Sequence, residues 1–232
     1  SRPRLVVNTR VTARDLPQVR SANVIADLPG TDLKDEIVLL GAHLDSWDPG
    51  VGALDDGAGV AIAIAAAKLA HESRLRPRRT LRVVLFANEE FGLSGAARYA
   101  ADEATVIAQH AVAMEADTGA GPVWRLSAKV GAGNWPLVER IHGVVAPLGV
   151  ELGNNTTSSG ADIQPLVRQG VPVISPVLDA SLYFDVHHTA NDTLDKVNPE
   201  HLRQSVAVFA AAAYLAAMEP GAFERLPPPP PR

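Results

Sequence analysis

The sequence predicts an α/β protein whose central sheet is mostly parallel. Three short apolar runs, at residues 37–40, 80–87 and 110–116, are typical of strands buried on both faces. Each run ends in an acidic or histidine side chain, and a helix-like stretch or a glycine-rich turn follows it. Because open α/β sheets place their ligand sites at the carboxyl ends of the strands, this repetition predicts one active edge.

In the first half of the chain, the remaining elements are a leading strand, a second strand and two helices. We expect strands over residues 5–11 and 22–28, and helices over residues 59–71 and 92–101. Residues 59–71 are too rich in alanine and too long for a strand, so they predict a buried helix. Gly57 and Gly59 would let its first turn pack closely against the sheet.

In the second half, strands are expected over residues 123–128 and 171–178, and helices over residues 135–148, 162–168 and 199–218. Pro136 and Pro199 suit the first turn of a helix. The prolines within 171–178 predict an edge strand. Residues 154–160 (NNTTSSG) are expected to form a polar surface loop.

The composition predicts a single globular domain and excludes several functions. A chain of 232 residues that is 47% apolar can bury one substantial core. A net charge of −5 argues against a nucleic-acid partner, and the absence of cysteine excludes disulfides, thiolate metal sites and a cysteine nucleophile. No apolar run is long enough to span a membrane, and no signal peptide is recognisable. We expect a leading segment (1–22), a catalytic body (23–220) and a disordered proline-rich tail (221–232).

The strand over residues 37–40 is followed by a cluster of polar side chains: His43, Asp45, Asp48, Asp55 and Asp56. Imidazole and carboxylate groups together suit zinc, and a carboxylate can bridge two ions. His43 is a candidate metal ligand and Asp45 a candidate partner that orients its ring. Taken alone, the two residues also fit an ordinary surface loop, and Asp55-Asp56-Gly57 fits a simple turn.

Glu89 and Glu90 follow the second apolar strand directly. Burial and mutual repulsion would raise a carboxyl pKa there unless a cation or a catalytic role accounts for the pair, although a solvated helix start is the alternative. Taken singly, Asp117 after the third strand fits a residue that caps a turn, and His188 in a later segment fits an ordinary loop histidine. The joint pattern favours a metal site, because possible ligands recur at successive strand ends and in adjoining loops.

Four blocks of the sequence together resemble a known family. They are GAHLDSWDPGVGALDDGAG, FANEEFGLSGA, MEADTG and HHTANDTLDKV, in this order. They resemble the signatures of the di-zinc aminopeptidase and glutamate carboxypeptidase family, and among its branches the plasma glutamate carboxypeptidase (carboxypeptidase Q) branch. The likeness runs from about residue 23 to residue 218. It implies a three-layer sandwich with a mixed, mostly parallel sheet between helices.

The resemblance implies five ligands for two divalent ions, expected to be zinc: His43 and Asp117 on one ion, Glu90 and His188 on the other, and Asp55 bridging both. It places Glu89 as the general base and Asp45 as the partner of the first histidine. It also implies a cis peptide bond between Asp55 and Asp56.

Further roles follow from the same resemblance. His187 stands where many relatives have a tyrosine, so it becomes an electrophilic helper for the oxyanion. Ser159, Gly160 and Asp162 fall where relatives line the substrate pocket. The alternative for these three residues is a polar surface loop.

The implied activity is hydrolysis of short peptides by a di-zinc exopeptidase, as an aminopeptidase or dipeptidase. Two alternatives remain: a mononuclear zinc acyltransferase like glutaminyl cyclase, and a catalytically inactive interaction domain on the same fold. The branch resemblance also implies secretion or a periplasmic location and a possible homodimer. Because members of this branch carry an upstream segment and an inserted protease-associated domain, we expect the chain to be the distal catalytic portion.

Overall fold

A seven-stranded mixed sheet forms the centre of the computed structural model, which describes residues 4–14, 16–73, 76–102, 107–158 and 160–227. The strands are β1 (Val24–Leu28), β2 (Leu33–His43), β3 (Arg79–Phe86), β4 (His110–Glu115), β5 (Val123–Lys129), β6 (Glu151–Leu152) and β7 (Val173–Leu178). Their order across the sheet is β1-β3-β2-β4-β7-β5-β6. β2 pairs in parallel with β3 and β4, whereas β1 with β3 and β5 with β7 are antiparallel pairs. The predicted mixed, mostly parallel centre is confirmed.

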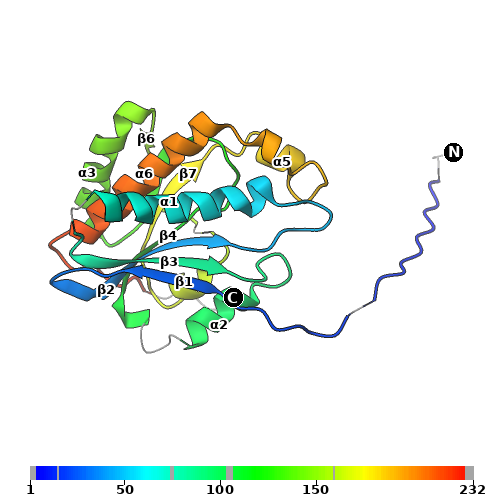
Figure 1. The fold of residues 1–232 in the computed structure, drawn as a ribbon, viewed down its shortest axis with the longest axis horizontal. Coiled ribbons are helices and arrows are strands. Elements are labelled where there is room, and N and C mark those ends of the chain that lie inside the picture. Colours follow the sequence, from blue (N-terminus) through cyan, green and yellow to red (C-terminus); the bar gives the residue numbers. More distant parts are fainter. Residues whose placement is uncertain (1–3, 15, 74–75, 103–106, 159, 228–232) are drawn as a thin grey trace.

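Helices cover both faces of the sheet and complete the predicted three layers (Figure 1). One face carries α1 (Ala58–Glu72), α3 (Trp135–Val145) and α6 (Pro199–Met218), whose apolar residues share one core cluster with the sheet. The other face carries α2 (Ser94–Asp102) and α4 (Gln164–Val167), which contribute to a second core cluster. The short helix α5 (Tyr183–Val186) lies beside the carboxyl edge of the sheet.

α1 forms where the alanine-rich stretch predicted it, and its buried side is made of small residues. Ala63, Ala66 and Ala70 are buried against the sheet together with Ile62. Gly59 lies in the first turn, where a Cβ atom would approach the carbonyl oxygen of Ala116 to 1.9 Å. This glycine therefore allows α1 to start directly against the end of β4.

α6 has the bounds that the sequence predicts. The side chain of Asn198 accepts hydrogen bonds from the backbone N–H groups of Glu200 and His201, and Pro199 occupies the first turn. These two features start the helix, and its alanine-rich stripe packs on α1 and on the sheet.

The chain after α6 is held against the body by a buried arginine. Arg79, at the start of β3, pairs with Glu36 and donates to the carbonyl oxygens of Glu219 and Gly221. Its guanidinium group also lies 5.2 Å from the centre of the Phe223 ring. Residues from 228 onward lie outside the described part of the chain, and the three-segment division stays a prediction.

Two strand predictions are wrong in position or type. Residues 5–11 form no strand and are exposed, and no strand among the described residues pairs with their backbone. β7 is not an edge strand, since it lies between β4 and β5. Its described pairing with β4 is limited to Ala113 and Val173, so Pro176 interrupts no described bond to β4.

Smaller differences concern where helices begin and end. α2 begins at Ser94 instead of residue 92, because Gly92 and Leu93 both have positive φ angles. α3 ends at Val145 and continues as a short 3₁₀ turn over residues 146–148. α4 occupies the middle of the predicted 162–168 helix.

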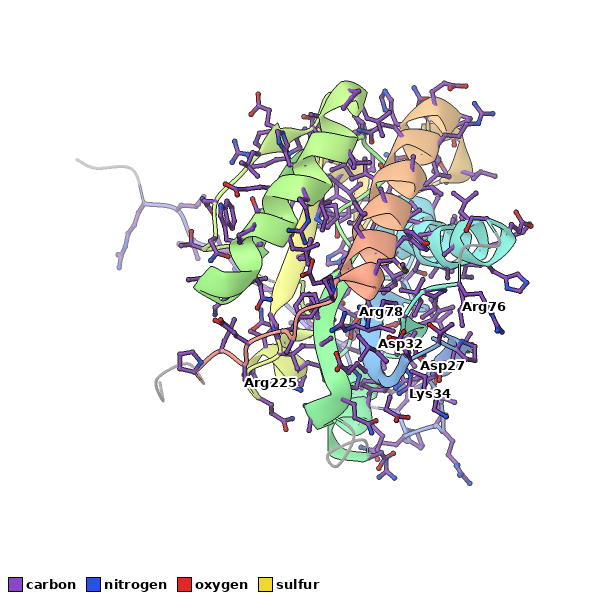
Figure 2. The ribbon with its side chains drawn as sticks, turned by 90° about the vertical axis from the view of Figure 1, so that its left-hand side faces the viewer. Asp27, Asp32, Lys34, Arg76, Arg78 and Arg225 are labelled. Atoms are coloured by element: carbon purple, nitrogen blue, oxygen red, sulfur yellow. The ribbon has the colours of Figure 1, made fainter. Side chains whose placement is uncertain are left out.

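Charged side chains at the amino ends of the parallel strands pair with one another. Figure 2, which faces this end, shows Asp32 and Arg78 next to each other, and their ion pair joins the starts of β2 and β3. Asp27 of β1 pairs in the same way with Arg82 of β3 at 2.8 Å. These paired charges lie opposite the carboxyl edge on which the predicted site depends. None of the described helices combines the length and the apolarity that a bilayer-crossing segment needs.

Candidate metal centre

His43, the last residue of β2, is the first candidate ligand of the site, and its ring is held in place. Its side chain is 1% exposed, and its ring nitrogen Nδ1 lies 2.9 Å from the backbone carbonyl oxygen of Asp45. The other nitrogen, Nε2, faces Asp55 Oδ1 at 3.1 Å and Asp117 Oδ1 at 3.4 Å. Asp117 follows β4, the neighbour of β2, so adjacent parallel strands bring these groups together.

His188 forms a second group of candidate ligands, again with two carboxylates near its Nε2 atom. Its Nε2 lies 2.9 Å from Glu90 Oε2 and 3.3 Å from Asp55 Oδ2. The backbone of His188 adopts a positive φ angle of 59°, which turns its ring toward the sheet edge from the loop after α5. Asp55 therefore presents one carboxylate oxygen to each histidine.

Asp55 is held in place by backbone contacts from a distant loop. Both carboxylate oxygens of the buried Asp192 accept hydrogen bonds, from the N–H groups of Leu54 at 2.7 Å and Asp55 at 3.1 Å. The peptide bond between Asp55 and Asp56 is cis, as the resemblance implies. Asp56 itself points to the backbone, where it accepts from the N–H groups of His43 and Gly59.

Asp45 positions the loop that carries the two glutamates. Its carboxylate accepts from the backbone N–H of Glu89 at 3.0 Å and of Glu90 at 3.2 Å. The carboxylate is 3.8 Å from His43 Nδ1, so the hydrogen-bonding contact to the imidazole is made by the Asp45 carbonyl oxygen instead. Asp45 thus connects His43 to the Glu89–Glu90 loop through two different groups.

The acidic surroundings shift the pKa values of the site. Burial lowers the pKa of His43, but hydrogen bonds with Asp117 and Asp55 outweigh it and raise that pKa to about 12. Burial raises the pKa of Glu89 to about 7, and the charge of Asp117 adds to the rise. Burial also raises the pKa of Asp117 and of Glu90. Such crowding of acids is costly unless cations are present.

Two of the three predicted pocket residues lie next to a further, half-buried acid. Glu115, at the end of β4, accepts from the backbone N–H groups of Asp162 at 3.2 Å and Ile163 at 2.9 Å. Gly160 lies against the same carboxylate, because a Cβ atom there would approach it to 2.3 Å. Asp162 is buried, its carboxylate oxygens have no hydrogen-bond partner in the described structure, and burial with the charge of Glu115 raises its pKa to about 9. Ser159 lies outside the described residues.

His187 lies beside the second histidine. Its ring stacks on Tyr183 with ring centres 4.6 Å apart and is 4.5 Å from the ring of His188. Its Nδ1 is buried and has no hydrogen-bond partner in the described structure. Burial raises the pKa of Asp55, but its hydrogen bond with His43, the charge of His43 and a further hydrogen bond with the Tyr183 hydroxyl group outweigh burial and lower that pKa.

Sequence reasoning gave no role to Tyr183, Asp192 or Glu115. Tyr183 and Asp192 flank the HHTA block, and Glu115 lies within MEADTG, so their proximity to candidate ligands was the available signal. The sequence could not indicate that Tyr183 and Asp192 act on Asp55, which is more than 120 positions away. Asp48, named among the polar residues after β2, is exposed.

The donor atoms fit divalent cations. Ligand atoms of His43, Asp55 and Glu90 lie within 4.8 Å of one another. Asp55 Oδ2 and Glu90 Oε1 are buried and have no hydrogen-bond partner among the described residues. A second such group contains His43, Asp56 and Asp117, although the Asp56 oxygens already accept backbone hydrogen bonds. Imidazole with several carboxylates is a donor set typical of zinc. The fold and site therefore define an α/β protein with a candidate metal centre at the carboxyl edge of its sheet.

Comparison with known proteins identifies the family. Residues 23–213 match the model of peptidase family M28, and the chain belongs to this family. Carboxypeptidase Q of Rattus norvegicus is 35% identical over 218 residues, which is 92% of this chain and 45% of that protein. The chain thus spans about half the length of the curated relatives it matches.

Solved structures agree with this assignment. A peptidase M28 precursor from Shewanella amazonensis SB2B is 50% identical, with a TM-score of 0.86 over 89% of this chain and 47% of that chain. The zinc aminopeptidase BSAP from Bacillus subtilis (21% identity, TM-score 0.67, 83% and 49% coverage) and a glutaminyl cyclase from an Acidobacteriales bacterium (23%, 0.63, 84% and 73%) share the fold. At these identities the last two likenesses establish the fold alone.

Proposed function

We propose that this chain is the catalytic portion of a di-zinc exopeptidase that hydrolyses dipeptides or other short peptides. The supporting observation is the position of Asp55 between two histidines, with one carboxylate oxygen near the Nε2 atom of each. Asp117 completes the group around His43, and Glu90 completes the group around His188. A carboxylate that can bridge two ions is what a two-metal hydrolytic site needs.

When bound, the two ions would supply Lewis acidity, which lowers the pKa of water and polarises the peptide carbonyl group. The protein's own contribution centres on Glu89, whose pKa is raised by burial to about 7. A carboxylate with a pKa near neutrality can take a proton from attacking water and return it to the leaving amine. Asp45 supports this role because it holds the backbone of Glu89.

The substrate would be positioned by the side chains around this centre. His187 is proposed as a donor to the developing oxyanion, since its buried Nδ1 has no described partner. Gly160 and Asp162, with Ser159, are proposed to line the pocket for the substrate backbone. A carboxylate or ion at the site would anchor the free amino group of the peptide, which limits cleavage to chain ends.

The test is hydrolysis of a dipeptide panel by metal-free protein with and without added zinc. We expect turnover to appear as zinc approaches two equivalents per chain, with metal content measured by plasma mass spectrometry. Calcium, which prefers six to eight oxygen ligands, serves as the control ion and should not restore activity. Absence of zinc-dependent hydrolysis across the panel, with two ions bound, would favour the inactive interaction domain.

The acyltransferase alternative makes a different prediction. A mononuclear enzyme of that type would bind one zinc ion per chain and cyclise a peptide with an amino-terminal glutamine. The geometry favours two ions, because both histidines have their own carboxylate partner besides Asp55. Assay of a glutaminyl peptide beside the dipeptide panel separates the two reactions.

A secreted or periplasmic location and a homodimeric state are also proposed, and both are supported only by the branch resemblance. Sedimentation of the purified protein at several concentrations tests the dimer. Fractionation of cells that express the full-length protein tests the location.

A further inference from the structure

The two histidines of the centre are held in different ways. His43 is buried, and its Nδ1 has a backbone carbonyl partner 2.9 Å away, which fixes the ring. Metal-bound histidines usually have such a partner on their second nitrogen. The side chain of His188 is 40% exposed, and its described polar contacts, to Asp55 and Glu90, both involve Nε2. Another contact must therefore orient its ring.

Trp47 provides this contact. Its indole ring stacks on the imidazole of His188, with ring centres 4.7 Å apart and planes inclined by 18°. Phe91 stacks on Trp47 at 5.0 Å and 12°. The backbone N–H of Trp47 also hydrogen-bonds to the Glu90 carboxylate. One residue in the loop after β2 thus contacts both candidate ligands of the same ion.

We propose that Trp47 is a positioning residue for the Glu90–His188 half of the metal centre, and that its ring sets the affinity for the ion bound there. The proposal rests on the proposed two-ion function. His187 also touches the His188 ring, but its plane is tilted by 38°, so it supports the imidazole less evenly. The His43–Asp117 half has no described contact with Trp47.

Substitution of Trp47 tests the ring specifically, because every variant except proline keeps the backbone N–H. Trp47→Leu removes the aromatic surface and leaves an apolar side chain, whereas Trp47→Phe keeps a ring that can stack. Trp124→Leu is a matched control, since Trp124 is 39% exposed and Trp47 is 38% exposed, and Trp124 lies in β5 against Arg125.

The primary measurement is zinc affinity of metal-free protein in competition with a chromophoric chelator. We expect Trp47→Leu to bind one zinc ion as tightly as the wild type and the second about 10- to 100-fold more weakly, the range found when groups behind a metal ligand are removed. Trp47→Phe should recover most of this loss, and Trp124→Leu should bind both ions as the wild type does.

Fluorescence gives a second, independent signal. Trp124→Phe with Trp135→Phe leaves Trp47 as the single tryptophan. Its emission should change with one equivalent of zinc, the equivalent whose binding Trp47→Leu weakens, and should stay nearly constant with the other equivalent. A purely structural role for Trp47 would not link its emission to one ion.

The outcomes separate this inference from the proposed function. If wild-type protein binds fewer than two zinc ions, the two-ion function fails. If wild-type protein binds two but Trp47→Leu binds both with unchanged affinity, or loses both equally, the positioning role of Trp47 is refuted.

Discussion

At the scale of single residues, Glu89 has the clearest test. Glu89→Gln removes the proton acceptor but preserves size, and its side chain has no described metal-ligand contact. We expect zinc content to stay at the wild-type level while kcat falls by about 10²- to 10⁴-fold. Glu72→Gln, at an exposed position in α1, is the control and should leave kcat unchanged. Full activity of the Glu89→Gln variant would remove Glu89 from the mechanism.

Asp192 should stabilise the folded protein, because it holds the loop that carries Asp55. Asp192→Ala leaves the buried N–H groups of Leu54 and Asp55 without acceptors, so the variant should lose about 1–3 kcal/mol per unpaired group in unfolding free energy. Urea denaturation measures this loss. Zinc binding should weaken with it, because Asp55 loses its backbone support.

Asp195→Ala is the comparison for this variant, since Asp195 is exposed and three positions away. The unfolding free energy of Asp195→Ala should stay within about 0.5 kcal/mol of the wild-type value. Equal stability of the two variants would show that Asp192 does not hold the Asp55 loop.

The sequence indicates the residues that approach the site but not those that support them. His43, Glu90 and Asp117 each follow an apolar strand, and parallel strands bring their ends together, so local polarity was sufficient to choose them. Asp192 accepts hydrogen bonds from the loop that carries Asp55, and Trp47 stacks on the His188 ring. Both contacts join segments that are distant in the sequence, so only the folded chain brings them together. Asp45 was predicted as the partner of His43, and its carbonyl oxygen is the group that contacts the ring at 2.9 Å. Its carboxylate lies 3.8 Å from the ring and accepts hydrogen bonds from the glutamate loop, which the sequence did not indicate.

At the scale of elements, the start of α1 depends on Gly59. Gly59→Ala would place a Cβ atom 1.9 Å from a backbone carbonyl and 2.2 Å from Asp56 Oδ1, so α1 must move or the strand end must shift. We expect a loss of about 3 kcal/mol or more in unfolding free energy, at the upper end of overpacking effects. Thermal or urea denaturation measures it.

Gly143→Ala is the matched control in α3, because an added Cβ atom meets nothing within 4 Å there. Alanine favours helix over glycine, so this variant should gain about 0.4–1 kcal/mol. A Gly59→Ala variant as stable as the wild type would mean that α1 does not need close contact with β4.

Elements that have their own periodicity and end signals were predictable, whereas those that depend on partners were not. α1 and α6 follow from alanine-rich length and, for α6, a proline in the first turn. Residues 5–11 have strand-like valines, but a strand also needs a neighbour. The interior place of β7 depends on β5 returning antiparallel beside it, which no local pattern in 171–178 indicates.

At the scale of the whole molecule, the buried acids predict how the metal-free protein responds to pH. Burial raises the pKa values of Glu89, Glu115 and Asp162 to about 7, 8 and 9. The folded state therefore keeps protons that the unfolded state has released, and stability falls as pH rises through these values. His43, whose pKa is raised to about 12 against the effect of burial, acts in the same direction.

Melting temperatures in chelator at pH 5.5, 7 and 8.5 should thus decrease by several degrees across the series. Asp55, whose pKa is lowered despite its burial, stabilises the folded state throughout this pH range and loses this effect only in stronger acid. Saturating zinc should reduce the decrease, because nearby bound cations lower the pKa values of these acids and zinc stabilises the folded state to which it binds. A melting temperature that rises toward pH 8.5 in chelator would contradict the burial of these groups.

The separation of charge along the molecule has a kinetic consequence. At the amino ends of β2 and β3, Asp32 pairs with Arg78 and Glu36 pairs with Arg79. At the opposite edge, the described ion pairs of the candidate-site acids involve histidines alone. Where these acids are ionised, the open end of the sheet carries negative charge that attracts small cations from solution. Zinc should reach this protein faster than it reaches a neutral site, and added salt should slow that encounter, because the field extends only about 8 Å at physiological ionic strength.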